Sequence, residues 1–155
     1  MTHADCPERF LAFAQKAFIV REGKLLLVRR SGNDPVNPFK WEVPGGRMKP
    51  GESVDEHIRR EVFEEVGLQV VAGKPFFIWQ WSVPLRDKNA VLDIVGVARI
   101  CTGEHGEPTL DHQENDDYLD RVEWVDAGAI LAYDLIPNML PVAAAFRAML
   151  ETPNE

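Results

Sequence analysis

The segment from Gly46 to Leu68 constrains this chain most, because it specifies one helix with a clear start and a clear end. Ser53, followed three residues later by Glu56, forms a capping box that favours a helix beginning after Ser53. Gly67 can adopt the left-handed conformation that ends a helix. We therefore expect a single helix between these two signals, entered from a glycine turn.

Three glutamates, Glu61, Glu64 and Glu65, lie close together on this helix. An advance of about 100° per residue gives the helix a core-facing stripe, and the glutamates border that stripe over an arc of about 100°. The stripe consists of Val54, Ile58, Val62 and Val66. Carboxylates ~6 Å apart on one helix face repel by roughly 2–3 kcal/mol at an effective dielectric of about 20. A divalent cation would reverse the sign of that interaction, so the segment predicts a hard-metal site.

An alternative interpretation is a solvated charged face with salt bridges between successive turns. Half-buried carboxylates cost free energy without a partner, and Arg60 can compensate one of them, with Glu52 as its expected partner. Gly45 and Gly46 favour the metal interpretation, because glycines let the backbone approach a ligand closely. His57 borders the acids, and we expect it on the helix surface.

The chain has 155 residues and the size of a single domain, expected to span 1–155. Its formal net charge of -8 at pH 7 argues against binding to duplex nucleic acid. Cys6 and Cys101 fit no metal or redox spacing, which favours a reducing, cytoplasmic setting. The first residues lack a basic stretch followed by an apolar run, so we expect no secretory signal. The apolar stretch 10–20 is too short to span a bilayer, so we expect no membrane association.

Alternating apolar residues and turn signals predict a sheet interrupted by the acidic helix. Apolar runs on both sides of Glu22-Gly23 predict a hairpin there. The expected strands are 17–20, 24–29, 41–43, 69–85, 90–102 and 121–125, with loops at 31–40 and 102–120 and turns at 44–46 and 86–89. Further helices are expected at 126–133 and 138–151. This order of elements predicts a mixed sheet with helices on both faces.

The segment from Gly46 to Leu68 is similar to the Nudix box and matches each fixed position of that motif. These positions are Gly46, Glu52, Arg60, Glu61, Val62, Glu64, Glu65, Gly67 and Leu68. Trp41–Gly46 and Arg121–Val125 resemble other parts of the same family. The resemblance implies the Nudix fold, an α/β/α sandwich with a central mixed β-sheet. It also implies Mg²⁺-dependent hydrolysis, with Mn²⁺ as a substitute, of the pyrophosphate bond in a nucleoside diphosphate linked to another moiety.

The resemblance also implies roles for particular residues. The implied metal ligands are the carbonyl of Gly45, Glu61, Glu64, Glu65 and, from outside the box, Glu114. Arg60 and Glu52 correspond to the ion pair that braces the site. Glu61 is the expected general base. We expect Arg30 and the Gly46 backbone at the substrate, although Arg30 fits a surface arginine at a strand end equally well.

The identity of the substrate stays open at this stage. Pro84 resembles a feature of ADP-ribose-type members, whereas the short chain resembles MutT-type hydrolases of nucleoside triphosphates or 8-oxo-dGTP. Trp79 and Trp81 share one strand face and fit core packing better than base stacking. The alternatives to hydrolysis are a non-catalytic nucleotide- or protein-binding domain and an isomerase, but the retention of all three acids favours catalysis. Many relatives resemble homodimers, so a homodimer is an option that the sequence leaves open.

Overall fold

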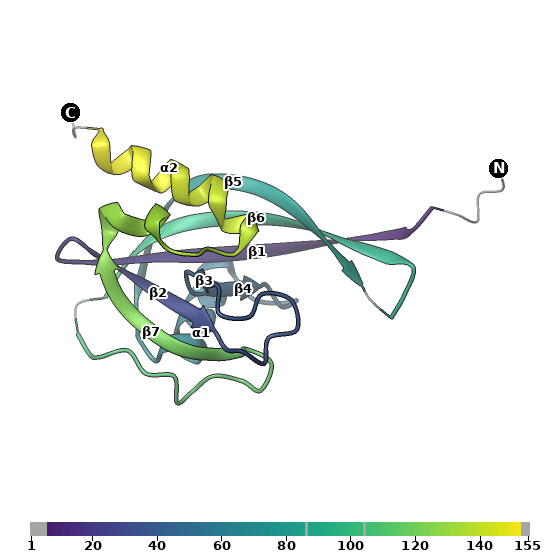
Figure 1. Cartoon of the computed structure of the whole chain (residues 1–155), viewed down its shortest axis with the longest axis horizontal. Helices are drawn as coiled ribbons and strands as arrows, with labels where there is room; N and C mark the ends of the chain where they lie inside the picture. Colours follow the sequence, from purple (N-terminus) through teal and green to yellow (C-terminus); the bar gives the residue numbers. More distant parts are fainter. Residues whose placement is uncertain (1–5, 86, 104, 153–155) are drawn as a thin grey trace.

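The structure is a computed structural model that describes residues 6–85, 87–103 and 105–152, and Figure 1 shows its arrangement. The strands are β1 (Glu8–Arg21), β2 (Lys24–Arg30), β3 (Trp41–Glu42), β4 (Gly45–Arg47), β5 (Val71–Leu85), β6 (Ala90–Thr102) and β7 (Leu119–Asp126). The helices are α1 (Val54–Val66) and α2 (Leu140–Glu151), with the 3-10 helices η2 (Ala127–Ala132) and η3 (Pro137–Met139). The predicted strands and helices therefore occur in the predicted order, with β4 as an additional strand.

β1 is the strand around which the sheet is built. It pairs in parallel with β6, from Glu8 opposite Ala90 to Val20 opposite Thr102. Its other edge pairs antiparallel with β4 and then with β2. β5 pairs antiparallel with β6, while β3 and β7 both pair antiparallel with β2. One parallel pair among antiparallel ones makes the sheet mixed, as predicted.

Helices cover the sheet on both faces, because neighbouring residues of β1 and β2 point alternately to opposite sides. On one face Ile19 and Leu26 pack with the α1 side chains Ile58, Val62 and Val66. On the other face the buried partners are Phe18, Leu25, Leu27, Met139, Val142 and Phe146. The α/β/α sandwich is therefore confirmed, and α1 is anchored through three of the four stripe residues that the sequence predicted.

Three predictions about this part of the chain were wrong. β1 begins at Glu8 rather than at residue 17, because its first half pairs with β6. Residues 45–47 were predicted in a turn, but they form β4 because they pair with β1. Val54 was predicted in the core, but as the first residue of α1 it is 49% exposed and precedes the buried stripe.

Most local predictions elsewhere are confirmed. Glu22 and Gly23 both have positive φ values, of 50° and 77°, which is the conformation of a tight hairpin turn. Asp126 caps the next helical segment by accepting a hydrogen bond from the Gly128 N–H, although that segment is a 3-10 helix.

Arg86 of the predicted turn and Glu104 of the predicted loop lie outside the described residues. Within the ranges that the structure describes, no helix has both the length and the apolar character needed to cross a membrane.

The first half of β1 and the ends of β5 and β6 form a ribbon that extends toward the N-terminus (Figure 1). Trp79 and Trp81 lie near its base, with ring centroids 5.2 Å apart. The Trp79 indole N–H donates to the Asn138 carbonyl at 2.9 Å. Both rings are partly buried and pack against neighbouring core clusters, so they have the packing role predicted for them.

Candidate active site

The acidic helix α1 has the local structure that its sequence predicts. The Ser53 hydroxyl accepts the Glu56 N–H, and the Glu56 carboxylate accepts the Ser53 N–H, which completes the capping box. Gly67 ends the helix at φ 70°, in the left-handed region. These two signals fix the length of α1 and therefore the rotational positions of its acids. Glu61 and Glu65 are 9% and 5% exposed, so both lie at the edge of the buried stripe as expected.

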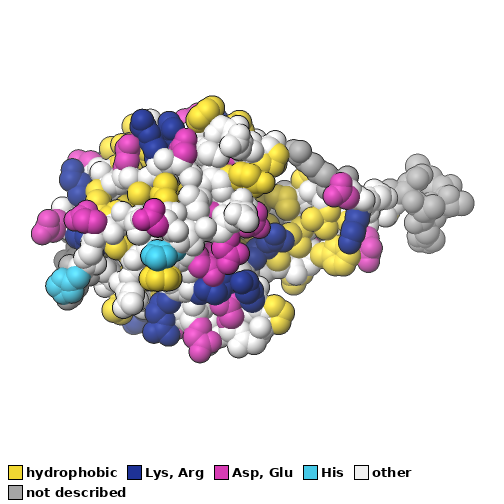
Figure 2. All heavy atoms as spheres, turned by 90° about the horizontal axis from the view of Figure 1, so that it is seen from below, with side chains coloured by type: hydrophobic (Ala, Val, Ile, Leu, Met, Phe, Trp, Pro, Cys, Tyr) yellow, Lys and Arg dark blue, Asp and Glu magenta, His cyan; other side chains and the backbone are white. Residues whose placement is uncertain are grey.

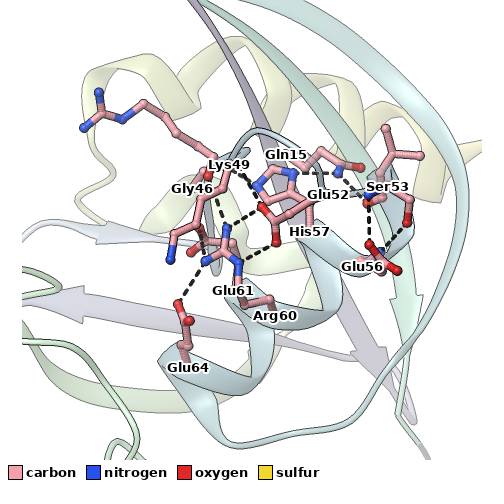
Figure 3. Close-up of polar contacts among 12 residues, drawn as sticks. Gln15, Gly46, Lys49, Glu52, Ser53, Glu56, His57, Arg60, Glu61 and Glu64 are labelled. Carbon is pink, nitrogen blue, oxygen red and sulfur yellow. Dashed lines mark hydrogen bonds and ion pairs between the residues drawn. The ribbon is translucent and has the colours of Figure 1, made fainter.

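Arg60 is the basic centre of the acidic cluster (Figure 3). Its Nε donates to Glu52 Oε2 at 2.6 Å and its Nη2 donates to Glu52 Oε1 at 2.9 Å, so the predicted ion pair is present and bidentate. Its Nη1 donates to both Glu61 Oε1 and Glu64 Oε2 at 3.1 Å. The hydrogen bonds with Arg60 lower the pKa of Glu52 to about 2. One guanidinium therefore faces three carboxylates, rather than the single one that the sequence suggested.

A second, buried network lies behind Glu65. The Lys16 ammonium is 2.6 Å from Glu42 Oε1, and Arg30 Nε is 2.5 Å from Glu42 Oε2. Burial alone would raise the pKa of Glu42, but the charges of Lys16 and Arg30 outweigh this effect, so the pKa is lowered overall. Glu65 accepts the Gly45 N–H at 2.9 Å. The ion pairs therefore join β1, β2 and β3, while Glu65 in the last turn of α1 is bonded to β4 and interacts electrostatically with Glu42 and Lys16.

Glu61 and Glu65 lack sufficient positive charge around them. Burial raises the pKa of Glu61, and burial together with the charge of Glu42 raises the pKa of Glu65 well above its usual range. Together these two groups of charged residues hold six carboxylates and three cations, which leaves an excess of three negative charges when all nine groups are ionised. The carboxylates are Asp34, Glu42, Glu52, Glu61, Glu64 and Glu65, and the cations are Lys16, Arg30 and Arg60.

The donor set fits a hard divalent cation, because it consists of carboxylate oxygens whose combined charge such an ion would neutralise. Glu61 and Glu64 already direct one oxygen each at the same cationic nitrogen of Arg60. In the part of the chain that the structure describes, no three Asp, Glu, His or Cys side chains converge on one point as they stand. Arg60 separates two of the carboxylates, and Glu65 is bonded to Gly45, so binding of a cation requires these side chains to shift.

The glycines before the helix lie against the acids. A Cβ atom at Gly46 would lie 2.8 Å from the Glu61 carboxylate oxygens, and a Cβ atom at Gly45 would lie 2.1 Å from the Gln15 carbonyl oxygen. The clash with backbone excludes a larger residue at Gly45, whereas a larger residue at Gly46 would displace the Glu61 carboxylate. The close approach brings the backbone of β4 to the acidic face of α1, where the sequence predicted a backbone contribution to the site.

The structure shows the surroundings of two further residues that were predicted at the site. Arg30 is bonded to Glu42 and to the Asp117 carbonyl, which leaves its side chain 21% exposed rather than directed freely at solvent. Glu114 is exposed, and its N–H donates to the Asp117 carboxylate at 2.7 Å. Burial, with a further contribution from the charge of Glu64, raises the pKa of Asp117. Asp117 therefore interacts electrostatically with an acid of α1.

The prediction of a surface position for His57 was wrong. Its side chain is fully buried, and both ring nitrogens have hydrogen-bonding partners. Sequence reasoning also missed Lys16 and Gln15, which lie next to each other on β1. Two polar residues inside an otherwise apolar strand were a usable signal, because such residues need buried partners.

Figure 2 shows acidic and basic side chains side by side on the face viewed from below.

A mixed sheet between helices, with glutamates clustered on the helix that follows the glycines of β4, defines the class of this protein. The family described as NUDIX domain matches residues 13–146, and the chain therefore belongs to the NUDIX family. It is a Nudix hydrolase.

The chain is similar in sequence to curated nucleoside triphosphatases and in structure to a MutT protein. Nucleoside triphosphatase NudI of Enterobacter sp. (strain 638) is 40% identical over 73 residues, a stretch that covers 46% of this chain and 50% of that protein. NudI of Escherichia coli (strain K12) is 28% identical over 123 residues, covering 76% of this chain and 83% of that protein. The crystal structure of the MutT protein from Methanosarcina mazei Go1 has a TM-score of 0.69 and 28% identity, covering 94% of this chain and 99% of the other.

The raised pKa of Glu65 predicts a measurable effect on stability. A carboxyl group whose pKa is higher in the folded chain stabilises the fold while protonated, and this contribution is lost as pH rises from about 4.5 through the raised value. In EDTA at pH 7, Glu65→Gln should therefore be more stable than wild type by about 1–3 kcal/mol, since it removes a buried charge and keeps an acceptor for Gly45. Urea unfolding of both proteins at pH 4 and pH 7 measures this difference, which should shrink at the lower pH.

Proposed function

We propose that this protein hydrolyses nucleoside triphosphates at a pyrophosphate bond, with Mg²⁺ held by Glu61, Glu64, Glu65 and the Gly45 carbonyl. The observation on which this rests is the excess of negative charge at the edge of α1, opposite the glycines of β4. The relatives named nucleoside triphosphatase support this substrate class. Pro84, which suggested ADP-ribose, lies on the edge strand β5, where a proline needs no further explanation.

The bound cation would supply charge neutralisation of phosphate oxygens and a lower pKa for an attacking water. Glu61 would accept the proton of that water. Burial raises the pKa of Glu61 toward neutral pH, which is the direction that a general base requires. Arg60 would hold Glu61 and Glu64 in place while braced by Glu52. Attack on phosphorus and rupture of the P–O–P bond would release a nucleoside monophosphate and pyrophosphate.

An acid from outside the box is part of this proposal. Glu114 remains the candidate proposed from sequence, while the electrostatic interaction of Asp117 with Glu64 favours Asp117. We predict that the residue in this role loses about 10–100-fold in kcat/KM on replacement by its amide. Steady-state assays of Glu114→Gln and Asp117→Asn at several Mg²⁺ concentrations compare the two. A normal rate for Asp117→Asn together with a large loss for Glu114→Gln would restore the sequence-based assignment.

A panel of substrates tests the proposed function directly. With Mg²⁺ present, canonical nucleoside triphosphates should yield pyrophosphate and monophosphate faster than ADP-ribose, NADH, nucleotide sugars or dinucleoside polyphosphates. The triphosphates should include 8-oxo-dGTP, and the Glu61→Gln variant serves as the control for contaminating phosphatases. Turnover of ADP-ribose alone would reject the proposed substrate class, and turnover of none would reject hydrolysis of these nucleotides. The homodimer and the cytoplasmic setting remain predictions.

A further inference from the structure

His57 is a buried polar residue that the catalytic proposal above does not use. It lies on the sheet-facing side of α1, between Gln15 of β1 and Gly46 of β4 (Figure 3). Its Nδ1 is 2.9 Å from Gln15 Nε2, and its Nε2 is 2.9 Å from the Gly46 carbonyl oxygen. The ring therefore connects the central strand to the glycine backbone that faces the acids.

The neighbours of Gln15 determine the orientation of its amide group. Its Nε2 donates to the Val54 carbonyl at 2.7 Å, which only the nitrogen end of the amide can do. Its Oε1 accepts from Arg99 Nη1 at 3.4 Å, which only the oxygen end can do. Arg99 is itself held by the Asp55 carboxylate at 2.7 Å. These contacts direct an N–H of Gln15 at His57.

The orientation of Gln15 determines the tautomer of His57. Because the Gln15 amide donates, Nδ1 of the imidazole must accept and carries no proton. The proton of the neutral ring is then on Nε2, which donates to the Gly46 carbonyl. Burial lowers the pKa of His57, which is consistent with a neutral ring.

The backbone held by His57 also contacts two of the acids. Gly46 packs against the Glu61 carboxylate with no room for a Cβ atom, and the Gly45 N–H donates to Glu65. β4 is only three residues long, and its strand pairing is with β1 at residues 14–16. The hydrogen bond from His57 thus adds a direct tie from α1 to a short strand that contacts both glutamates.

We propose that His57 is a positioning residue whose Nε2–H, fixed by Gln15, holds the Gly45–Gly46 backbone in register with Glu61 and Glu65. The proposal rests on the function proposed above for those glutamates. His57 touches neither substrate nor reacting atoms, and it acts through the orientation of the backbone that contributes the Gly45 carbonyl.

Three variants test the proposal. His57→Leu removes the donor, His57→Gln keeps an N–H at a similar distance along the side chain, and Arg59→Leu changes an exposed residue of the same helix as the matched control. We expect His57→Leu to accelerate hydrogen exchange at the Gly45 amide about tenfold, the effect of losing roughly one hydrogen bond. His57→Gln and Arg59→Leu should stay close to wild type. Mg²⁺ affinity should fall about 10–100-fold in His57→Leu and recover in His57→Gln.

The tautomer supplies a readout that needs neither metal nor substrate. Long-range ¹H–¹⁵N spectra of wild type at pH 7 should show the Nε2–H form of His57. Gln15→Met removes one of the two partners that select this form and leaves only the Gly46 carbonyl, so the fraction of the Nδ1–H form should rise. An Nδ1–H ring in wild type would overturn the proposal, as would unchanged Gly45 exchange in His57→Leu or an equal loss in His57→Gln. If His57→Leu fails to fold, the Gln15→Met spectrum and the His57→Gln exchange rate decide. Absence of turnover in wild type would reject the proposed function. The spectra and exchange rates would still test whether His57 holds the Gly45–Gly46 backbone in place.

Discussion

Replacing Glu61 by Gln should lower kcat by about 10²–10⁴-fold, the contribution expected from a general base. The substitution keeps the size of the side chain and the contact with Arg60, because an amide oxygen can still accept from Nη1. It removes the charge and the capacity to take a proton from water. Steady-state kinetics with saturating Mg²⁺, together with calorimetric measurement of Mg²⁺ affinity, should show a large loss in kcat with a smaller change in binding.

Glu64→Gln is the matched comparison, because both carboxylates accept from the same guanidinium nitrogen at 3.1 Å. If Glu64 is a ligand and Glu61 the base, Glu64→Gln should weaken Mg²⁺ binding more and recover part of its rate at high Mg²⁺ concentration. Equal losses of kcat in both variants, with unchanged metal affinity, would contradict this division of roles.

Lys16→Met should destabilise the protein by about 3–5 kcal/mol, the cost expected when one partner of a buried ion pair is removed. The Lys16 and Glu42 side chains are 8% and 3% exposed, and their closest atoms are 2.6 Å apart. Without Lys16, Arg30 alone would balance the Glu42 charge, and Glu65 would lose a neighbouring cation that lowers its pKa. Urea unfolding at pH 7 measures the loss.

Lys24→Met provides the control, because Lys24 lies exposed at the start of β2 and a surface substitution there should change stability by no more than about 0.5 kcal/mol. The double variant Lys16→Met/Glu42→Gln should recover part of the loss, since it removes the uncompensated carboxylate as well. A loss below about 1 kcal/mol in Lys16→Met would show that the pair does not stabilise the fold.

The helix and its ion pair could be predicted from sequence because their determinants are local. The capping box spans four residues, and Arg60 lies eight residues from Glu52. The motif also identified the acids at the edge of the core, which the burial of Glu61 and Glu65 confirms.

The remaining partners could not be predicted, because they depend on contacts between distant parts of the chain. Lys16 and Glu42 are 26 residues apart, and Gln15 and His57 are 42 residues apart. The position of His57 was predicted from the helical angle alone, yet the face of α1 on which it lies is covered by β1 and β4. Strand β4 was mistaken for a turn for the same reason, since its pairing partner is β1.

The parallel pairing of β1 with β6 has a consequence for the order of folding. The motif is complete in the nascent chain at Leu68, but Gln15 and Lys16 belong to a strand whose long pairing partner ends only at Thr102. Contacts between such distant segments form late, since a large loop must close first. A fragment that stops near residue 70 would hold every residue of the motif and still lack an ordered catalytic centre.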